Sequence, residues 1–142
     1  MKYCVLLPET DEPAKAVPCT IDDVLPMCYE LIGCRTVQLI PIYEHRIKPG
    51  YDLLTDEDIP EGKTVCINPL ASWIFGADIH GSGILGNAVI LKLERNEEDE
   101  ESMDLAFMTE EEANAMAEEL NKDYDDKYDQ VVFKVLTSMM KD

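Results

Sequence analysis

The chain has 142 residues, of which 30 are acidic and 12 basic, so its formal net charge is −18. Hydrophobic residues make up 46% of the chain, which is enough for one packed domain and argues against disorder throughout. A surface of this charge repels a phosphate backbone, so we expect no direct binding to nucleic acid. No run of residues is apolar for long enough to cross a bilayer, so we expect no membrane partner either.

The first half of the chain predicts four elements. Apolar and β-branched runs predict strands, and helical spacing of apolar residues from Ile21 predicts a helix with Thr20 as its N-cap. Pro26 is a defect in that helix, which either kinks there or becomes regular only near Leu25. In chain order the elements are a strand over 2–8, an extended piece over 15–20, a helix over 21–33 and a strand over 35–42.

A long polar connection over 43–63 follows, with turn signals and room for a short strand near 51–55. A third strand is predicted over 64–68. Asn68 before Pro69 then predicts an N-cap with proline at the first helical position, and Gly76 ends that short helix. The run over 87–95 is the clearest strand in the sequence.

Thr109 and Glu112 form a capping box that opens a helix over 109–124. The final run over 130–136 suits a strand, although its spacing also fits a helix. The predicted fold is one α+β domain over 1–142, with a mainly antiparallel sheet of four to five strands packed against two or three helices. The buried stripe of the last helix is predicted to comprise Ala113, Met116, Ala117, Leu120 and Tyr124.

The charge is concentrated towards the C-terminus. Residues 94–142 hold 17 acidic and 5 basic side chains, a net charge of −12, against 13 and 7 in residues 1–93. An exposed acidic loop is predicted over 96–104. It is either a solvated surface or a contact surface for a basic partner. In the second case the partner-binding residues are Glu97, Glu98, Glu100 and Glu101.

The five cysteines include no C-x-x-C pair, and the N-terminal residues differ from a secretion signal. We therefore expect a cytoplasmic protein with buried structural thiols. The two histidines, His45 and His80, lack Cys, Asp or Glu at the spacing of a known metal site. We expect no metal, no cofactor and no catalytic residue, and so a protein that is not an enzyme.

Gly81, Gly83 and Gly86 match the G-x-G-x-x-G pattern of dinucleotide-binding loops. That motif requires a strand before it and a helix after it, whereas here the predicted order is the reverse. Dinucleotide binding by this motif is therefore rejected. A small ligand could still use an aromatic ring, loop amides and a few cations. The candidate ligand-binding residues are Asn68, Trp73, His80, Gly81, Gly83, Arg35, Arg46 and Lys48.

The segment from Asn68 to Leu91 carries a resemblance, together with Leu31-Ile32-Gly33 and the Thr109 to Glu111 helix start. The chain resembles a domain-of-unknown-function family of small proteins encoded by phages, prophages and conjugative elements of Gram-positive bacteria. The resemblance covers roughly residues 1 to 120. It implies a mobile-element origin and an anti-defence or host-takeover role in the host cytoplasm, and brings no catalytic residues.

Three hypotheses follow. The first is a non-enzymatic binding protein that blocks a host defence protein or, as an oligomer, sequesters a small nucleotide signal. The second is a regulatory or structural accessory protein without a ligand. The third is a hydrolase of such a signal, for which the sequence supplies neither a metal cluster nor an activated nucleophile.

Overall fold

The computed structural model describes residues 2–9, 12–43, 46–57, 67–76, 83–95, 98 and 103–124. The antiparallel sheet and the helices confirm the predicted α+β class, with one strand more than expected. The elements are β1 (Tyr3–Leu7), β2 (Lys15–Pro18), α1 (Val24–Ile32), β3 (Val37–Ile40), β4 (Tyr51–Asp56), α2 (Pro69–Phe75), β5 (Ala88–Arg95), β6 (Met103–Ala106) and a helix over 110–124.

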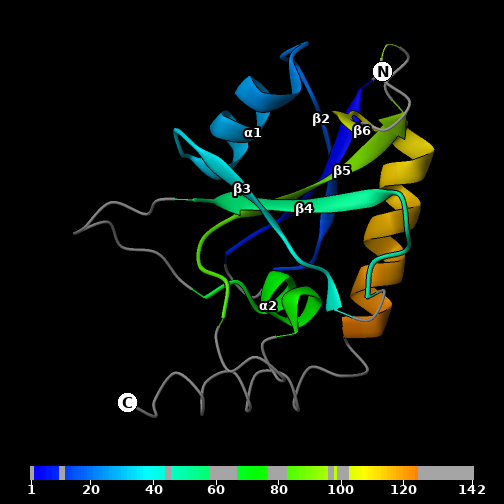
Figure 1. Ribbon diagram of the computed structural model, residues 1–142. Helices are drawn as coiled ribbons and strands as arrows, with labels where there is room; N and C mark the ends of the chain where they lie inside the picture. The colour runs from blue at the N-terminus through cyan, green and yellow to red at the C-terminus, as the bar shows by residue number, and fades with distance from the viewer. Residues whose placement is uncertain are drawn as a thin grey trace.

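The strands are ordered β2-β1-β5-β4-β3, and every pairing is antiparallel (Figure 1). The eight-residue strand β5 has two partners along one edge. Its first half pairs with β1, where Leu7 faces Ala88, and its second half pairs with β6, where Lys92 faces Ala106. β5 is therefore the centre of the sheet.

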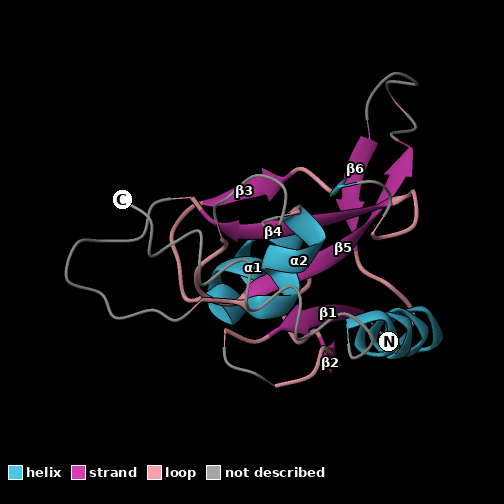
Figure 2. Cartoon of the chain, turned by 90° about the horizontal axis from the view of Figure 1, so that it is seen from below, coloured by secondary structure: helices cyan, strands magenta, loops and turns pink. Residues whose placement is uncertain are grey.

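Helices cover both faces of the sheet. The side chains of successive β5 residues point to opposite faces of the sheet. Ala88 and Ile90 belong to one buried cluster, whereas Val89 and Leu91 belong to the other. α1 packs on the second side, whereas α2 and the helix over 110–124 pack on the first. Figure 2 shows the helix over 110–124 beside β1 and β2. We call the two sides the α1 face and the α2 face.

The predicted helix start at Ile21 with Thr20 as N-cap is wrong, whereas the alternative of a helix that becomes regular only near Leu25 agrees with the structure. α1 begins at Val24, and its N-cap is Asp23 rather than Thr20. Pro26 therefore lies in the first helical turn, where backbone N–H groups have no intrahelical acceptor and proline removes no bond. A proline that would break the predicted helix is thus compatible with the shorter one.

The short strand for which the connection had room near 51–55 is present as β4, whereas the strand at the end of the acidic loop was not expected. The connection 43–63 includes β4, which lies between β3 and β5, and the acidic loop 96–104 runs into β6. Of the predicted strand over 64–68, the described part has only one bridge, between Ile67 and Leu85. Residues 64–66 and the run over 130–136 lie outside the described residues.

The two later helices form as predicted. Asn68 caps α2, Pro69 occupies its first turn and Gly76 ends it with φ of 88°. The capping box is present as two hydrogen bonds between Thr109 and Glu112. All five residues of the predicted stripe lie in or against the α2-face cluster. Among the described residues, none of the helices combines the length and apolar character that a membrane span requires.

Candidate functional site

Asn68 is the best connected of the predicted ligand-binding residues, and it is fully buried. Its Oδ1 accepts a hydrogen bond from the Ala71 amide at 3.0 Å, which is the helix cap. Its Nδ2 donates to the carbonyl oxygens of Leu7 at 2.8 Å and Gly86 at 2.9 Å. The side chain thus joins α2 to the end of β1 and to the loop before β5, so its polar atoms are engaged within the fold.

Trp73 is 6% exposed, which confirms the expectation that it is buried. The Arg46 guanidinium lies over its ring, 5.2 Å from the centroid, and over the ring of Tyr43 at 4.9 Å. Arg46 Nη1 also donates to the Trp73 carbonyl oxygen at 2.6 Å, at the C-terminal end of α2. A covered, buried ring offers no open face on which a nucleotide base could stack.

The remaining predicted ligand residues do not converge in the described structure. Lys48 lies over the Tyr51 ring at 5.3 Å, and Arg35 is exposed in the turn between α1 and β3. Gly83 is half-buried in the segment that leads to Gly86, and Gly86 has a φ of 82°. His80 and Gly81 lie outside the described residues. Gly83 and Gly86 follow a helix, α2, and precede a strand, β5. This confirms the predicted order, which is the reverse of the order in a dinucleotide-binding loop.

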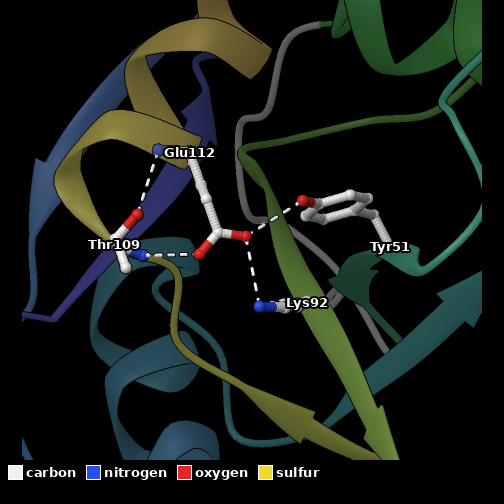
Figure 3. Close-up of polar contacts among 4 residues, drawn as sticks. All are labelled: Tyr51, Lys92, Thr109 and Glu112. Carbon is white, nitrogen blue, oxygen red and sulfur yellow. Dashed lines mark hydrogen bonds and ion pairs between the residues drawn. The ribbon is translucent and has the colours of Figure 1, made fainter.

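Glu112 connects the helix over 110–124 to the sheet (Figure 3). Its Oε2 accepts from Tyr51 Oη at 3.1 Å and from Lys92 Nζ at 3.2 Å, while Oε1 accepts from the Thr109 amide. The Thr109 amide, with Lys92 and Tyr51, lowers the pKa of this carboxyl. The sequence revealed the cap but not the strand partners, because Tyr51 and Lys92 are distant along the chain.

Four thiols lie on the α1 face: those of Cys4, Cys19, Cys28 and Cys34. Burial raises the pKa of Cys28 to about 12 and that of Cys4 further, so both remain protonated at neutral pH. These two match the prediction of buried structural thiols, whereas Cys19 and Cys34 are half-buried. In the part of the chain that the structure describes, no three His, Cys, Asp or Glu side chains gather in a way that could hold a metal ion.

The strands of the β5–β6 hairpin bring acidic residues together at its end. Glu94 and Asp104 stand directly opposite each other on the paired strands, and both are exposed. Of the predicted partner-binding residues, Glu98 is described and exposed, whereas Glu97, Glu100 and Glu101 lie outside the described residues. We call Glu94, Glu98 and Asp104 the acidic hairpin end.

A groove of about 720 Å³ adjoins the acidic hairpin end on the α1 face. Its walls come from α1, β3, β4, β5 and β6, and they are mostly leucine and valine side chains. Leu25 and Leu39 are the large hydrophobic residues that remain most exposed among those described, at 43% and 56%. The groove is lined by Val24, Leu25, Leu39, Asp52, Leu93, Asp104 and Leu105.

The groove exists because α1 is too short to cover its face of the sheet. Nine residues of helix span about 14 Å. Cys28 and Ile32 pack over Leu54 and Leu91, so the helix covers that part of the face and only its first residues reach the groove. Sequence reasoning missed this surface, since its residues are spread from 24 to 105.

Comparison with protein-family models, curated proteins and solved structures gives no match. The resemblance to the mobile-element family therefore stays a prediction. The site must be interpreted from its own chemistry, which combines a packed α2 face, an acidic hairpin end and an apolar groove beside it.

Proposed function

We propose that this chain is a non-enzymatic binding protein that holds a positively charged partner protein through the acidic hairpin end. The observation that carries the proposal is the pairing of Glu94 with Asp104 on adjacent strands. Both side chains are exposed, so two carboxylates at the end of one hairpin are accessible to the cationic side chains of a partner.

The rest of the charge distribution supports the same partner. The net charge of −18 attracts a basic protein over several ångströms and speeds its encounter. The loop between Glu94 and Asp104 adds Glu97, Asp99, Glu100 and Glu101 in sequence. A phosphate-bearing signal is a weaker candidate, because Asn68 and Trp73 are engaged in packing and the surface charge repels it.

The resemblance to a mobile-element family adds a biological setting to this proposal. In that setting the partner is a basic protein of the host cell, and occupying its basic surface is the anti-defence or host-takeover act. Basic surfaces on host proteins commonly bind nucleic acid, so an acidic protein would compete there.

The test is affinity capture from the lysate of a Gram-positive bacterium, the kind of host that the resemblance implies. The wild-type bait should retain a basic protein that is released as salt rises from about 0.05 M to about 0.5 M, because salt screens exposed charges. The double variant Glu94→Lys with Glu98→Lys should lose that protein.

The matched control is Glu118→Lys with Glu119→Lys, which makes the same change in net charge at exposed positions of the helix over 110–124. It should retain the partner. Equal loss in the two double variants would mean that only the total charge matters, and retention in both would refute the proposal.

A further inference from the structure

The groove on the α1 face has the size and composition of a binding pocket. Ligand sites typically enclose a few hundred to a thousand cubic ångströms, with apolar walls and a few polar groups. This groove is open to solvent and has a volume of about 720 Å³, and leucine side chains from four elements line it. Leu25 and Leu39 are half-exposed in the free protein. A partner that covers them removes apolar surface from water, and this burial contributes favourable free energy to binding.

Asp52 places a carboxylate among these leucines. It lies on β4 opposite Leu91, and burial raises its pKa. Within the described residues, no cation is paired with it. A partly desolvated carboxylate without a cation weakens the free protein, and a lysine or arginine supplied by a partner would offset that cost.

The charges around the groove select one kind of occupant. The carboxylate on the groove's own face is that of Asp52, because strand alternation turns Asp104, like Glu94 opposite it, away from the face that carries Leu93 and Leu105. A second copy of this chain would bring a further net charge of −18 and would be repelled. An acidic or phosphate-bearing ligand would be repelled in the same way.

We infer that the groove on the α1 face binds a segment of a partner protein that presents leucine-sized side chains together with a lysine or arginine directed at Asp52. This inference rests on the proposed function, since it takes the basic partner and names the part of it that docks. The acidic hairpin end attracts the partner, and the groove holds its apolar side chains.

The experiment uses a fluorescein-labelled synthetic peptide of alternating leucine and lysine, followed by fluorescence anisotropy with the full chain. A second peptide replaces leucine by serine. Wild-type protein should bind the leucine–lysine peptide at least about tenfold more tightly than the serine–lysine peptide.

Leu39→Asp should weaken binding of the leucine–lysine peptide by about tenfold or more. The substitution adds negative charge, so a loss cannot come from weaker attraction of a cation. Gln38→Asp adds the same charge on the neighbouring residue of β3, which points to the other face of the sheet, and should not weaken binding. Asp52→Asn, which is nearly isosteric, should weaken it severalfold, whereas Glu111→Gln should not.

Equal affinities of Leu39→Asp and Gln38→Asp, or of the two peptides for wild-type protein, would overturn the groove and leave the proposed cationic partner standing. Failure of wild-type protein to bind either cationic peptide would overturn the proposed function as well. A wild-type oligomer that Leu39→Asp dissociates in sedimentation experiments would assign the groove to a second copy and overturn the inference.

Discussion

The two faces of the sheet differ in how completely they are packed. On the α2 face, Asn68 and Glu112 each join three segments of the chain through hydrogen bonds, and Trp73 is covered by Arg46. On the α1 face a nine-residue helix leaves Leu25 and Leu39 half-exposed beside Asp52. The comparison shows that the segment with the most distinctive sequence contributes to packing, whereas the groove that we propose to bind a partner lies on the less completely packed face.

The largest expected effect is on the α2 face. Asn68→Ala removes the cap of α2 and leaves the Leu7 and Gly86 carbonyl groups without their partner, so the free energy of unfolding should fall by about 3 kcal/mol. Urea unfolding measures it. The control Asn114→Ala, at an exposed helix position, should have little effect. Similar losses in both variants would contradict the role given to Asn68.

Gly76→Ala should be the next most damaging change. The residue has φ of 88°, and an added Cβ would lie 2.8 Å from Cβ of Tyr43. Gly50 has a similar φ of 96° but open space around it. Gly50→Ala should therefore cost about 1 kcal/mol and Gly76→Ala at least about 2 kcal/mol. Equal urea midpoints for the two variants would show that Tyr43 does not pack tightly against α2.

Thr109→Ala should destabilise the protein by about 1 kcal/mol through loss of the capping hydrogen bond to the Glu112 amide. Thr20→Ala is the matched control, because Thr20 was the expected cap of the first helix and the structure assigns that position to Asp23. It should change the urea midpoint little. A larger effect at Thr20 than at Thr109 would reverse the assignment of the caps.

Glu112 should produce a smaller, pH-dependent effect. Its folded-state pKa lies below the usual 4.5, so its contribution to stability is present above that pH and is lost as pH falls through the folded-state pKa. Wild-type protein should therefore lose more stability than Glu112→Gln on acidification through this range. Parallel stability curves for the two proteins would contradict the network drawn in Figure 3.

The smallest stability effects are expected on the α1 face. Leu39→Asp should change the free energy of unfolding by no more than about 0.5 kcal/mol, because the side chain is 56% exposed. Asp52→Asn should leave stability unchanged or raise it at neutral pH, since the raised pKa means that ionised Asp52 disfavours the folded state. A marked loss in either variant would make these residues part of the packing.

Short-range signals in the sequence predicted the caps of the later helices correctly. Each cap depends on residues no more than four positions apart: Asn68 with Pro69, and Thr109 with Glu112. β4 was underestimated because Leu53 and Leu54 are both fully buried, one on each face, and such a strand lacks polar alternation.

The groove could not be predicted from spacing. Leu93 and Leu105 face each other only once β5 and β6 have paired, and Leu39 reaches the same surface through β4. The further hydrogen bonds of Asn68 to Leu7 and Gly86 are hidden for the same reason, since they span 61 and 18 residues. Long-range strand pairing, which a single sequence does not encode locally, creates both the buried hydrogen bonds of Asn68 and the groove on the α1 face.

The most direct test of the account is to map the bound peptide by amide correlation NMR. On titration of wild-type protein with the leucine–lysine peptide, the shifts should concentrate at the groove residues Leu25, Leu39, Leu93 and Leu105. They should disappear in Leu39→Asp while the rest of its spectrum stays folded. Shifts concentrated instead around Trp73 and Arg46, or on the helix over 110–124, would contradict the claim that the open α1 face is the binding surface.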